Sequence, residues 1–285
     1  MNSRIMNDSR GAARVLLVAA AFGIALAGSQ AYAGDLVLAL SPPLIEAEMV
    51  GGGLRQFTLR AYNQGTEAVH VEVSVRDLTL DLAGSPVVQP TGSTAYSCAP
   101  WSRLSKERLD LPAGAGEEVV LTVSPPREAE GGAYGVVAFE AQAGALRRGE
   151  EELTVRALVG CVVMVTIRDQ GERLAEIADL QIAPSGEAAE VVFAPVVENR
   201  GEVHFRASGS ILIWSEDRRV LDRVPLEVGT GTVLPGGQRR FQGTWSNKHT
   251  LRTGAYVAEA RIYIPGAPPL RYLRRFEVTV AEGTE

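Results

Sequence analysis

The sequence predicts an all-β fold made of two β-sandwiches in tandem. Three observations predict it: apolar and polar residues alternate, turn-forming residues recur about every ten positions, and the chain contains an internal repeat. Residues 55–63, "RQFTLRAYN", place Phe57, Leu59 and Ala61 on one face, and residues 69–75 place four valines on one face. Such alternation predicts half-buried antiparallel strands with one face toward a core.

The internal repeat consists of three short motifs that occur in the same order in both halves of the chain. Asn-x-Gly ends a strand in a turn for which we expect positive φ, Leu-Pro-x-Gly turns the chain, and Gly-Ala-Tyr opens a late strand. The second and third motifs keep their spacing, with 22 positions from Pro112 to Tyr134 and 21 from Pro235 to Tyr256. The motifs are Asn63-Gln64-Gly65 and Asn199-Arg200-Gly201, Leu111-Pro112-Ala113-Gly114 and Leu234-Pro235-Gly236-Gly237, and Gly132-Ala133-Tyr134 and Gly254-Ala255-Tyr256.

A tyrosine at the start of a late strand is a common corner device in immunoglobulin-like sandwiches. We therefore expect two immunoglobulin-like β-sandwich domains, residues 34–168 and 169–285. The boundary is placed in "IRDQGERLAE", where Asp169 to Glu172 interrupt the apolar pattern. One continuous sandwich is the alternative, although the length of the chain suits two domains of about 120 residues each.

Residues 1–33 have the layout of a secretory signal peptide. Arg10 and Arg14 give a basic start, Val15 to Ala27 form an apolar middle, and Ala31-Tyr32-Ala33 is a small-x-small cleavage site. The apolar run is shorter than the roughly 20 residues that cross a bilayer. We expect cleavage after Ala33, a periplasmic location without stable membrane insertion, and an extracellular or cell-surface location as the alternative.

The charge of the chain argues against nucleic acid as a partner. The full chain has a formal net charge of −6, and loss of Arg4, Arg10, Arg14 and Asp8 with the signal peptide takes it to −8. Phosphate binding depends on clustered Lys and Arg, which this balance does not favour.

Motifs for catalysis or metal binding are missing from the sequence. His70, His204 and His249 are its only histidines, and no nucleophile elbow, His-Glu-x-x-His or Gly-rich phosphate loop is present. We expect His70 and His204 to lie on the polar faces of strands in structural roles. The sequence therefore predicts a protein that is not an enzyme and that has no cofactor and no metal site.

The chain has two cysteines, Cys98 and Cys161. In a chain bound for an oxidising compartment such a pair tends to be joined, so we expect a structural disulfide. Two buried free thiols are the alternative. A zinc site is excluded because two sulfurs without nearby histidines do not complete its ligand shell.

The most apolar stretch beyond the N-terminus covers residues 151–170, "EELTVRALVGCVVMVTIRDQ". Only 11 residues separate Arg156 from Arg168, too few to span a membrane. The even positions mix polar residues with Leu158, Val162 and Met164. The pattern predicts a long last strand of the first domain, with an unbroken apolar row at odd positions: Leu153, Val155, Ala157, Val159, Cys161, Val163, Val165 and Ile167.

The first unit resembles the N-terminal domain of the periplasmic pilus-assembly (fimbrial) chaperones. The resemblance is carried by "SPPLIEAEMVGGGLRQFTLRAYNQG", "APWSRLSKERLDLPAGAGEEVVLTVSPP" and "GGAYGVVAFEA". In the second unit, "VVENRGEVHFRASGSILIW" and "VLPGGQRRF" are similar to the second immunoglobulin-like domain of such proteins. The resemblance covers nearly all of the chain after residue 33.

The resemblance implies an exported, non-enzymatic factor that holds a partner by β-strand addition along its long strand. The implied partners are exported protein subunits, such as pilus or surface-fibre subunits, and an outer-membrane usher. A structural or adhesive cell-surface or extracellular protein without chaperone activity is the alternative. The residues expected to bind the partner are Val155, Ala157, Leu158, Val159, Val162, Val163, Met164 and Val165.

One feature of that family has no counterpart in this sequence. The family anchors the subunit's terminal carboxylate with an arginine on the first strand and a lysine on the long strand. Here the first strand, "LVLALSPPLIEAE", has neither Arg nor Lys, and the long strand has only Arg156 and Arg168 near its ends. The anchoring role therefore passes to no residue of this chain.

Overall fold

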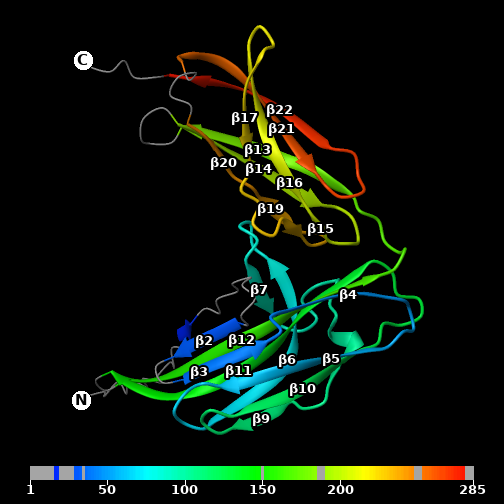
Figure 1. Cartoon of the computed structure of the whole chain (residues 1–285), viewed down its shortest axis with the longest axis vertical. Helices are drawn as coiled ribbons and strands as arrows, with labels where there is room; N and C mark the ends of the chain where they lie inside the picture. Colours follow the sequence, from blue (N-terminus) through cyan, green and yellow to red (C-terminus); the bar gives the residue numbers. More distant parts are fainter. Residues whose placement is uncertain are drawn as a thin grey trace, which may run out of the picture.

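The computed structural model describes residues 16–18, 29–33, 36–148, 151–184, 190–246 and 252–279. These residues form two immunoglobulin-like β-sandwiches in tandem, which confirms the predicted fold class (Figure 1). The helical element assigned among them is a single 3-10 turn, η1 (Ala99–Trp101). Over the same ranges, a helix with the length and apolar character to cross a membrane is not found.

The first sandwich has two sheets. One sheet has the strand order β1-β12-β11-β6-β7, with β4 also paired to β12 and β9 also paired to β6. The other sheet has the order β2-β3-β5-β10-β8. The strands of the first sheet are β1 (Leu16–Val18), β4 (Leu44–Met49), β6 (Val69–Leu80), β7 (Pro86–Gln89), β9 (Arg108–Leu111), β11 (Gly132–Arg148) and β12 (Glu151–Ile167), and those of the second are β2 (Ser29–Ala33), β3 (Leu36–Ser41), β5 (Arg55–Asn63), β8 (Ser102–Leu104) and β10 (Gly116–Val123).

The second sandwich is built in the same way. One layer contains β13, β14, β19 and β20, and the other has the order β17-β16-β21-β22. β15 and β18 form a separate two-stranded sheet. Its strands are β13 (Ala175–Pro184), β14 (Val191–Asn199), β15 (Phe205–Arg206), β16 (Ser208–Ser215), β17 (Val220–Pro225), β18 (Thr232–Val233), β19 (Gln238–Arg240), β20 (Gly243–Trp245), β21 (Gly254–Tyr263) and β22 (Leu270–Val278).

Each sandwich has its own hydrophobic core, and the alternating sequence pattern fills it. In β5, Leu59 and Ala61 are fully buried and Phe57 packs against the core. In β6, Val69, Val71 and Val73 are buried in the same core. The cores separate between Ile167 and Ala175, the segment in which the sequence places the domain boundary.

The segment that contains β3 and β4 divides between the two sheets of its sandwich. β3 pairs antiparallel with β5, whereas β4 pairs parallel with β12 from Val162 to Ile167. The chain changes sheets at the cis peptide bond between Ser41 and Pro42. As a result, β4 covers the outer edge of the C-terminal half of β12.

The sequence repeat is also a structural repeat, centred on two buried asparagines. Asn63 and Asn199 are 1% and 0% exposed. Each donates its side-chain amide to the carbonyl four residues later and to the strand that enters the Leu-Pro-x-Gly turn, at Leu111 and Val233. These hydrogen bonds satisfy backbone groups that burial would otherwise leave without partners.

The positive φ expected for the Asn-x-Gly turns is wrong, because neither Gly65 nor Gly201 has it. The asparagine oxygen itself accepts from the N–H two residues on, which turns the chain locally. Positive φ occurs in the other repeated turn, at Gly114 (71°) and Gly236 (70°). Only glycine adopts that conformation without steric cost.

We predict that Asn199→Ala destabilises the protein by about 2–3 kcal/mol, because it removes three hydrogen bonds and leaves buried backbone groups unsatisfied. Urea unfolding followed by circular dichroism measures the change. The control is Arg200→Ala, since the side chain of Arg200 is 53% exposed in its ion pairs with Glu176 and Glu198. That change should cost less than about 1 kcal/mol. Equal losses in both variants would contradict the structural role of Asn199.

Candidate functional site

The long strand predicted from the sequence is β12, and its odd-numbered side chains form the core of the first sandwich. Ala157, Val159, Cys161, Val163 and Val165 are 0% exposed. The side chains of residues 151–155, which include Leu153 and Val155, lie outside the described side chains. From position 157 onward, the odd-numbered side chains are therefore buried in the core and are not on the surface.

The even-numbered apolar residues of β12 pack in a second cluster on the other face of the sheet. Val162 and Met164 are 9% and 6% exposed and lie in a cluster with Leu234, a residue of the second unit. Leu158 packs at the margin of this cluster and is only partly buried. The cluster consists of Leu78, Tyr134, Val136, Ala138, Val162, Met164 and Leu234.

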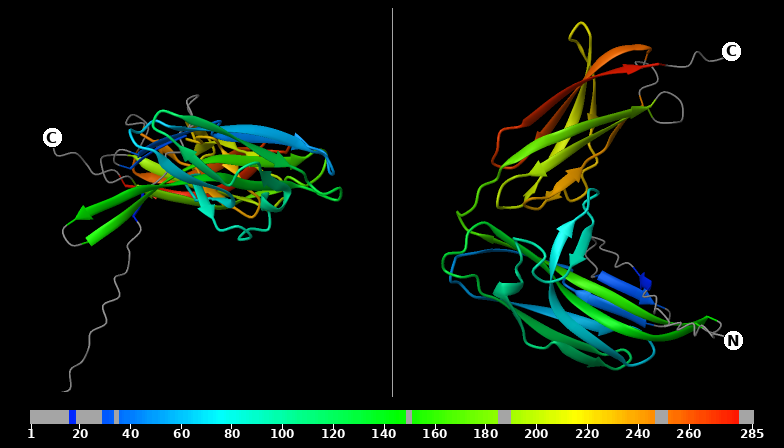
Figure 2. Two further views of the ribbon diagram at one scale, coloured as in Figure 1. Left: turned by 90° about the horizontal axis from the view of Figure 1, so that it is seen from below. Right: turned by 180° about the vertical axis from the view of Figure 1, so that it is seen from behind.

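The backbone edge of β12 has two strand neighbours on the side away from β11. β4 pairs with Val162 to Ile167, and β1 pairs in parallel with Val155 to Ala157. β1 itself belongs to residues 1–33, the expected signal peptide. On the other side β11 follows β12 along its length, and Figure 2 shows the paired ends of the two strands extending beyond the rest of the first sandwich.

Arg156 on β12 and Arg168, the residue after its last one, are each held by a carboxylate. Arg156 and Arg76 donate to Glu140 at 2.9 and 2.7 Å. Burial raises the pKa of Glu140, but these two hydrogen bonds outweigh it, so its pKa lies below the usual range. Arg168 donates to Glu48 on β4 at 2.5 Å. Neither arginine is a free anchor for a carboxylate from outside.

The junction between the sandwiches is a hydrogen-bonded network that starts at Tyr134. The Tyr134 hydroxyl accepts from the backbone N–H of His204 at 2.7 Å and lies 3.2 Å from Nδ1 of the same residue. His204 Nε2 lies 3.1 Å from Glu46 Oε1, and Arg206 donates to both oxygens of Glu46, at 3.1 and 2.6 Å. We call these four residues, Tyr134, His204, Glu46 and Arg206, the junction network.

One protonation state of His204 satisfies every contact of the network. Neutral His204 with its proton on Nε2 donates to Glu46 and accepts from the Tyr134 hydroxyl at Nδ1. Burial lowers the pKa of His204 below its usual range, although Glu46 lies beside it. The hydrogen bond from Arg206 holds the pKa of Glu46 below its usual range. The imidazole is therefore neutral and the carboxylate ionised at neutral pH.

Sequence reasoning missed this network. It placed His204 on the polar face of a strand, whereas the side chain is 9% exposed and lies between the two units. His70, for which the same role was expected, is exposed and pairs with Asp110. Glu46 lies on the first strand, where the resemblance to pilus chaperones expects an arginine. The repeated Gly-Ala-Tyr motif marked Tyr134, but nothing in the sequence indicated its partner.

A second contact between the units involves the turn between β6 and β7. The carbonyl of Leu82 accepts from the N–H of Arg240 at 2.8 Å. Gly84 lies on the guanidinium of Arg239, and a Cβ at Gly84 would come within 2.2 Å of its Cζ. Arg239 is 6% exposed and donates to the carbonyls of Thr232 and Val228. Only glycine fits at the tip of this turn.

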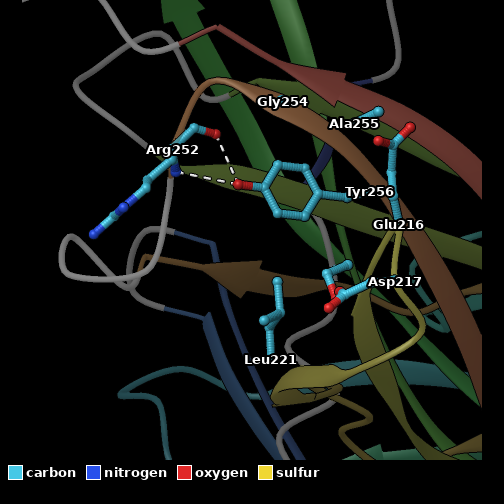
Figure 3. Close-up of a pocket in the computed structure, with 8 residues that line it drawn as sticks. Glu216, Asp217, Leu221, Arg252, Gly254, Ala255 and Tyr256 are labelled. Carbon is cyan, nitrogen blue, oxygen red and sulfur yellow. Dashed lines mark hydrogen bonds between the residues drawn. The ribbon is translucent and has the colours of Figure 1, made fainter.

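Tyr256, which matches Tyr134 in the repeat, makes a different contact. Its hydroxyl donates to the carbonyl of Arg252 at 2.8 Å and accepts from the N–H of the same residue (Figure 3). This is a tyrosine corner of the kind expected in an immunoglobulin-like sandwich. Figure 3 also shows the shallow pocket beside it, where β16 ends and β21 begins. The two copies of the motif thus have different partners.

The structure contains no disulfide between Cys98 and Cys161. Both are free thiols buried in the core of the first sandwich, which is the alternative to the expected disulfide. Burial raises the pKa of each thiol to about 12, so neither forms the reactive thiolate at neutral pH. Within the described ranges there is also no group of His, Cys, Asp and Glu side chains suited to hold a metal ion.

Comparison with known proteins gives likenesses among solved structures alone, since no family model and no curated protein matches the chain. A chaperone–tip adhesin complex of CFA/I fimbriae biogenesis has a TM-score of 0.43 at 12% identity, covering 83% of this chain and 98% of that chain. The class 5 fimbriae chaperone CfaA has a TM-score of 0.43 at 13% identity, with the same coverage. The CsuC–CsuE chaperone–tip adhesion subunit complex of archaic Csu pili from Acinetobacter baumannii has a TM-score of 0.39 at 10% identity, covering 86% of this chain and 99% of that chain. At such identities we argue function from the residues of this chain.

The junction network predicts that the protein loses stability as the pH falls. Unfolded His204 takes up a proton near pH 6.5, whereas folded His204 resists it, so the unfolded state binds more protons below that pH. Glu46 acts in the same direction at lower pH, because its depressed pKa stabilises the folded state only while it is ionised. We expect His204→Gln to flatten the decline in unfolding free energy between about pH 7 and pH 5. An unchanged slope in His204→Gln would contradict the assignment.

The buried thiols make a second prediction. Iodoacetamide should leave both cysteines of the native protein unmodified at neutral pH, because their pKa values are about 12 and the sulfurs are inaccessible. In denaturant without reductant, mass spectrometry should find both cysteines alkylated. An unmodified pair that reacts only after reduction would instead show a disulfide.

Proposed function

We propose that this chain is an exported, non-enzymatic factor that holds a partner protein by adding a strand of that partner to the outer edge of β12. The observation that carries the proposal is the pairing of β1 with Val155 to Ala157. It supports the proposal because this edge accepts a further parallel strand, and that strand is apolar, with the sequence Leu-Leu-Val.

The strand that pairs with Val155 to Ala157, β1, lies within the expected signal peptide. With cleavage after Ala33, β1 leaves the mature protein, whereas β4 stays in place on Val162 to Ile167. The backbone of β12 before Val162 then loses the neighbour that β1 provides. An unpaired strand edge is a template for another chain, and main-chain hydrogen bonds supply the affinity in this mode of binding.

Burial of side chains defines what β12 offers to a partner. Ala157, Val159, Val163 and Val165 point into the first core, and Val162 and Met164 pack in the second cluster. Their role is to hold the strand straight and rigid. The contacts with a partner are made by the backbone near Val155 to Ala157 and by Leu158, whose side chain is only partly buried.

The partner in this proposal is an exported subunit that needs an added strand, such as a subunit of a pilus or another surface fibre, met in the periplasm. An outer-membrane usher would receive such a subunit. Glu140 already binds Arg156, and Glu46 already binds Arg206. These arginines are therefore not available to bind a terminal carboxylate of the partner. Binding depends on the strand edge instead.

The proposal is tested with the mature chain, residues 34–285, and partners recovered from the periplasm of the native host. Hydrogen exchange should show that the partner protects the amides of residues 155–159. Leu158→Asp should reduce recovery of the partner by about tenfold, since it places a charge beside the added strand. Leu54→Asp is the matched control, because Leu54 is 65% exposed in a turn of the same sandwich.

Two results would contradict the proposal. One is full recovery of the partner by a folded Leu158→Asp protein, and the other is a complex in which the amides of residues 155–159 exchange as in the free protein. A structural or adhesive protein would give the second result if it bound through another surface.

A further inference from the structure

The outer face of the β17-β16-β21-β22 sheet, in the second sandwich, is strongly basic. Cross-strand register places Ser210, Arg261 and Arg271 in one row, Arg223, Leu212, Glu259 and Leu273 in the next, and Trp214, Val257 and Arg275 in a third. We call the exposed part of this surface the arginine face. It consists of Arg223, Arg271, Leu273 and Arg275, which are exposed, and Arg261, which is half-buried.

Two residues of this face, Arg261 and Arg271, stand directly opposite each other on neighbouring strands. Like charges in this arrangement destabilise a sheet. One carboxylate, Glu259, offsets them: it accepts from Arg261 at 2.8 and 2.9 Å and lies 3.8 Å from Arg271. Trp214 also donates its indole N–H to Glu259, at 3.1 Å.

The charges of the arginine face are therefore not balanced within it. Four arginines lie beside two carboxylates, Glu259 among them and Glu277 two residues after Arg275 on β22, a local formal charge of +2 in a chain whose net charge is −6. Glu259 is 6% exposed and is already shared by two arginines and the indole. A negatively charged partner would neutralise the arginines that Glu259 does not pair with closely.

Leu273 gives the arginine face an apolar centre. It is 64% exposed and lies between Arg271 and Arg275 along β22. Alternate residues of a strand are about 7 Å apart, so the side chains of Arg271 and Arg275 each leave the backbone about 7 Å from that of Leu273. An extended segment with an acidic residue two positions before and two positions after an apolar residue has the same spacing.

We propose that the arginine face binds an acidic protein segment with the pattern Glu-x-Leu-x-Glu. Asp can replace either Glu, and another apolar residue can replace Leu. Arginine pairs with carboxylates through two parallel hydrogen bonds, and Leu273 receives the apolar residue. An anionic membrane is a poorer fit. Trp214 is turned to Glu259, and the large apolar side chains that β16, β21 and β22 expose on this face are Leu273 and, at its edge, Tyr263, too few to insert into a bilayer.

This surface is separate from the strand edge in the proposed function. The arginine face belongs to the second sandwich, whereas β12 belongs to the first. Leu158→Asp should therefore leave binding at the arginine face unchanged, and the two proposals can fail independently.

The test measures binding of a fluorescent peptide containing Glu-Ala-Leu-Ala-Glu to the mature chain by anisotropy at low salt. Arg271→Gln should raise Kd by about tenfold or more through loss of a bidentate charge-assisted contact. Leu273→Ser should also weaken binding severalfold. The matched control is Arg103→Gln, which removes one exposed positive charge from β8 in the first sandwich.

A stability measurement separates binding from a structural role. Arg271→Gln removes one member of the like-charge pair, so its free energy of unfolding in urea should equal or exceed that of the wild type. The proposal is overturned if the peptide does not bind, if Arg271→Gln and Arg103→Gln weaken it equally, or if Lys-Ala-Leu-Ala-Lys binds as well. Tighter binding to phosphatidylglycerol vesicles than to the acidic peptide, with the same dependence on Arg271, would assign the face to a membrane and also overturn it.

Discussion

The junction between the two sandwiches is organised around one hydroxyl group, that of Tyr134. Tyr134 lies at the start of β11, and Glu46, at the other end of the junction network, lies on β4. These two strands are the neighbours of β12 on its two sides. His204 of the second sandwich contacts both of these strands, and Arg206 adds two hydrogen bonds to Glu46, so the junction engages the neighbours of β12 on both sides.

The chemistry of this junction favours one arrangement of the two sandwiches. A hydroxyl that accepts from a backbone N–H and donates to a ring nitrogen fixes the tautomer of His204 and thereby aims Nε2–H at Glu46. Glu46 is in turn oriented by the planar fork of Arg206. Beside this polar network, Leu234 packs among apolar residues of the first sandwich. Rotation of one unit against the other would break both kinds of contact together.

The fold could be predicted from the sequence because its determinants are local or periodic. Alternation with a period of two identified β5 and β6, and the odd apolar row of β12 matches the buried row of the structure. The three repeated motifs predict two units from the sequence alone. The Asn-x-Gly motif was recognised correctly as a turn, although the asparagine side chain and not a positive φ makes it.

The candidate site was harder to predict because its contacts join residues far apart in the chain. His204 meets Tyr134 across 70 positions and Glu46 across 158 positions, and no local pattern records such a pairing. The apolar even row of β12 had two readings, partner contact or burial within the chain, and Leu234 decides for burial at Val162 and Met164. Part of the arginine face is visible in the sequence, where Arg271 and Arg275 stand close together, but Arg223 and Arg261 join them only through the register of the sheet.

The hydroxyl of Tyr256 is bonded within its own sandwich, whereas the hydroxyl of Tyr134 is bonded to the other sandwich. The second sandwich contains its own corner, because Tyr256 bonds to Arg252 four residues away. In the first sandwich, the hydrogen bonds of the Tyr134 hydroxyl are made instead to His204 of the second sandwich. A chain that emerges from its N-terminus first therefore exposes the Tyr134 hydroxyl before its acceptor and donor exist. The junction network therefore forms only once the second sandwich is present, which couples these contacts of the first sandwich to completion of the chain.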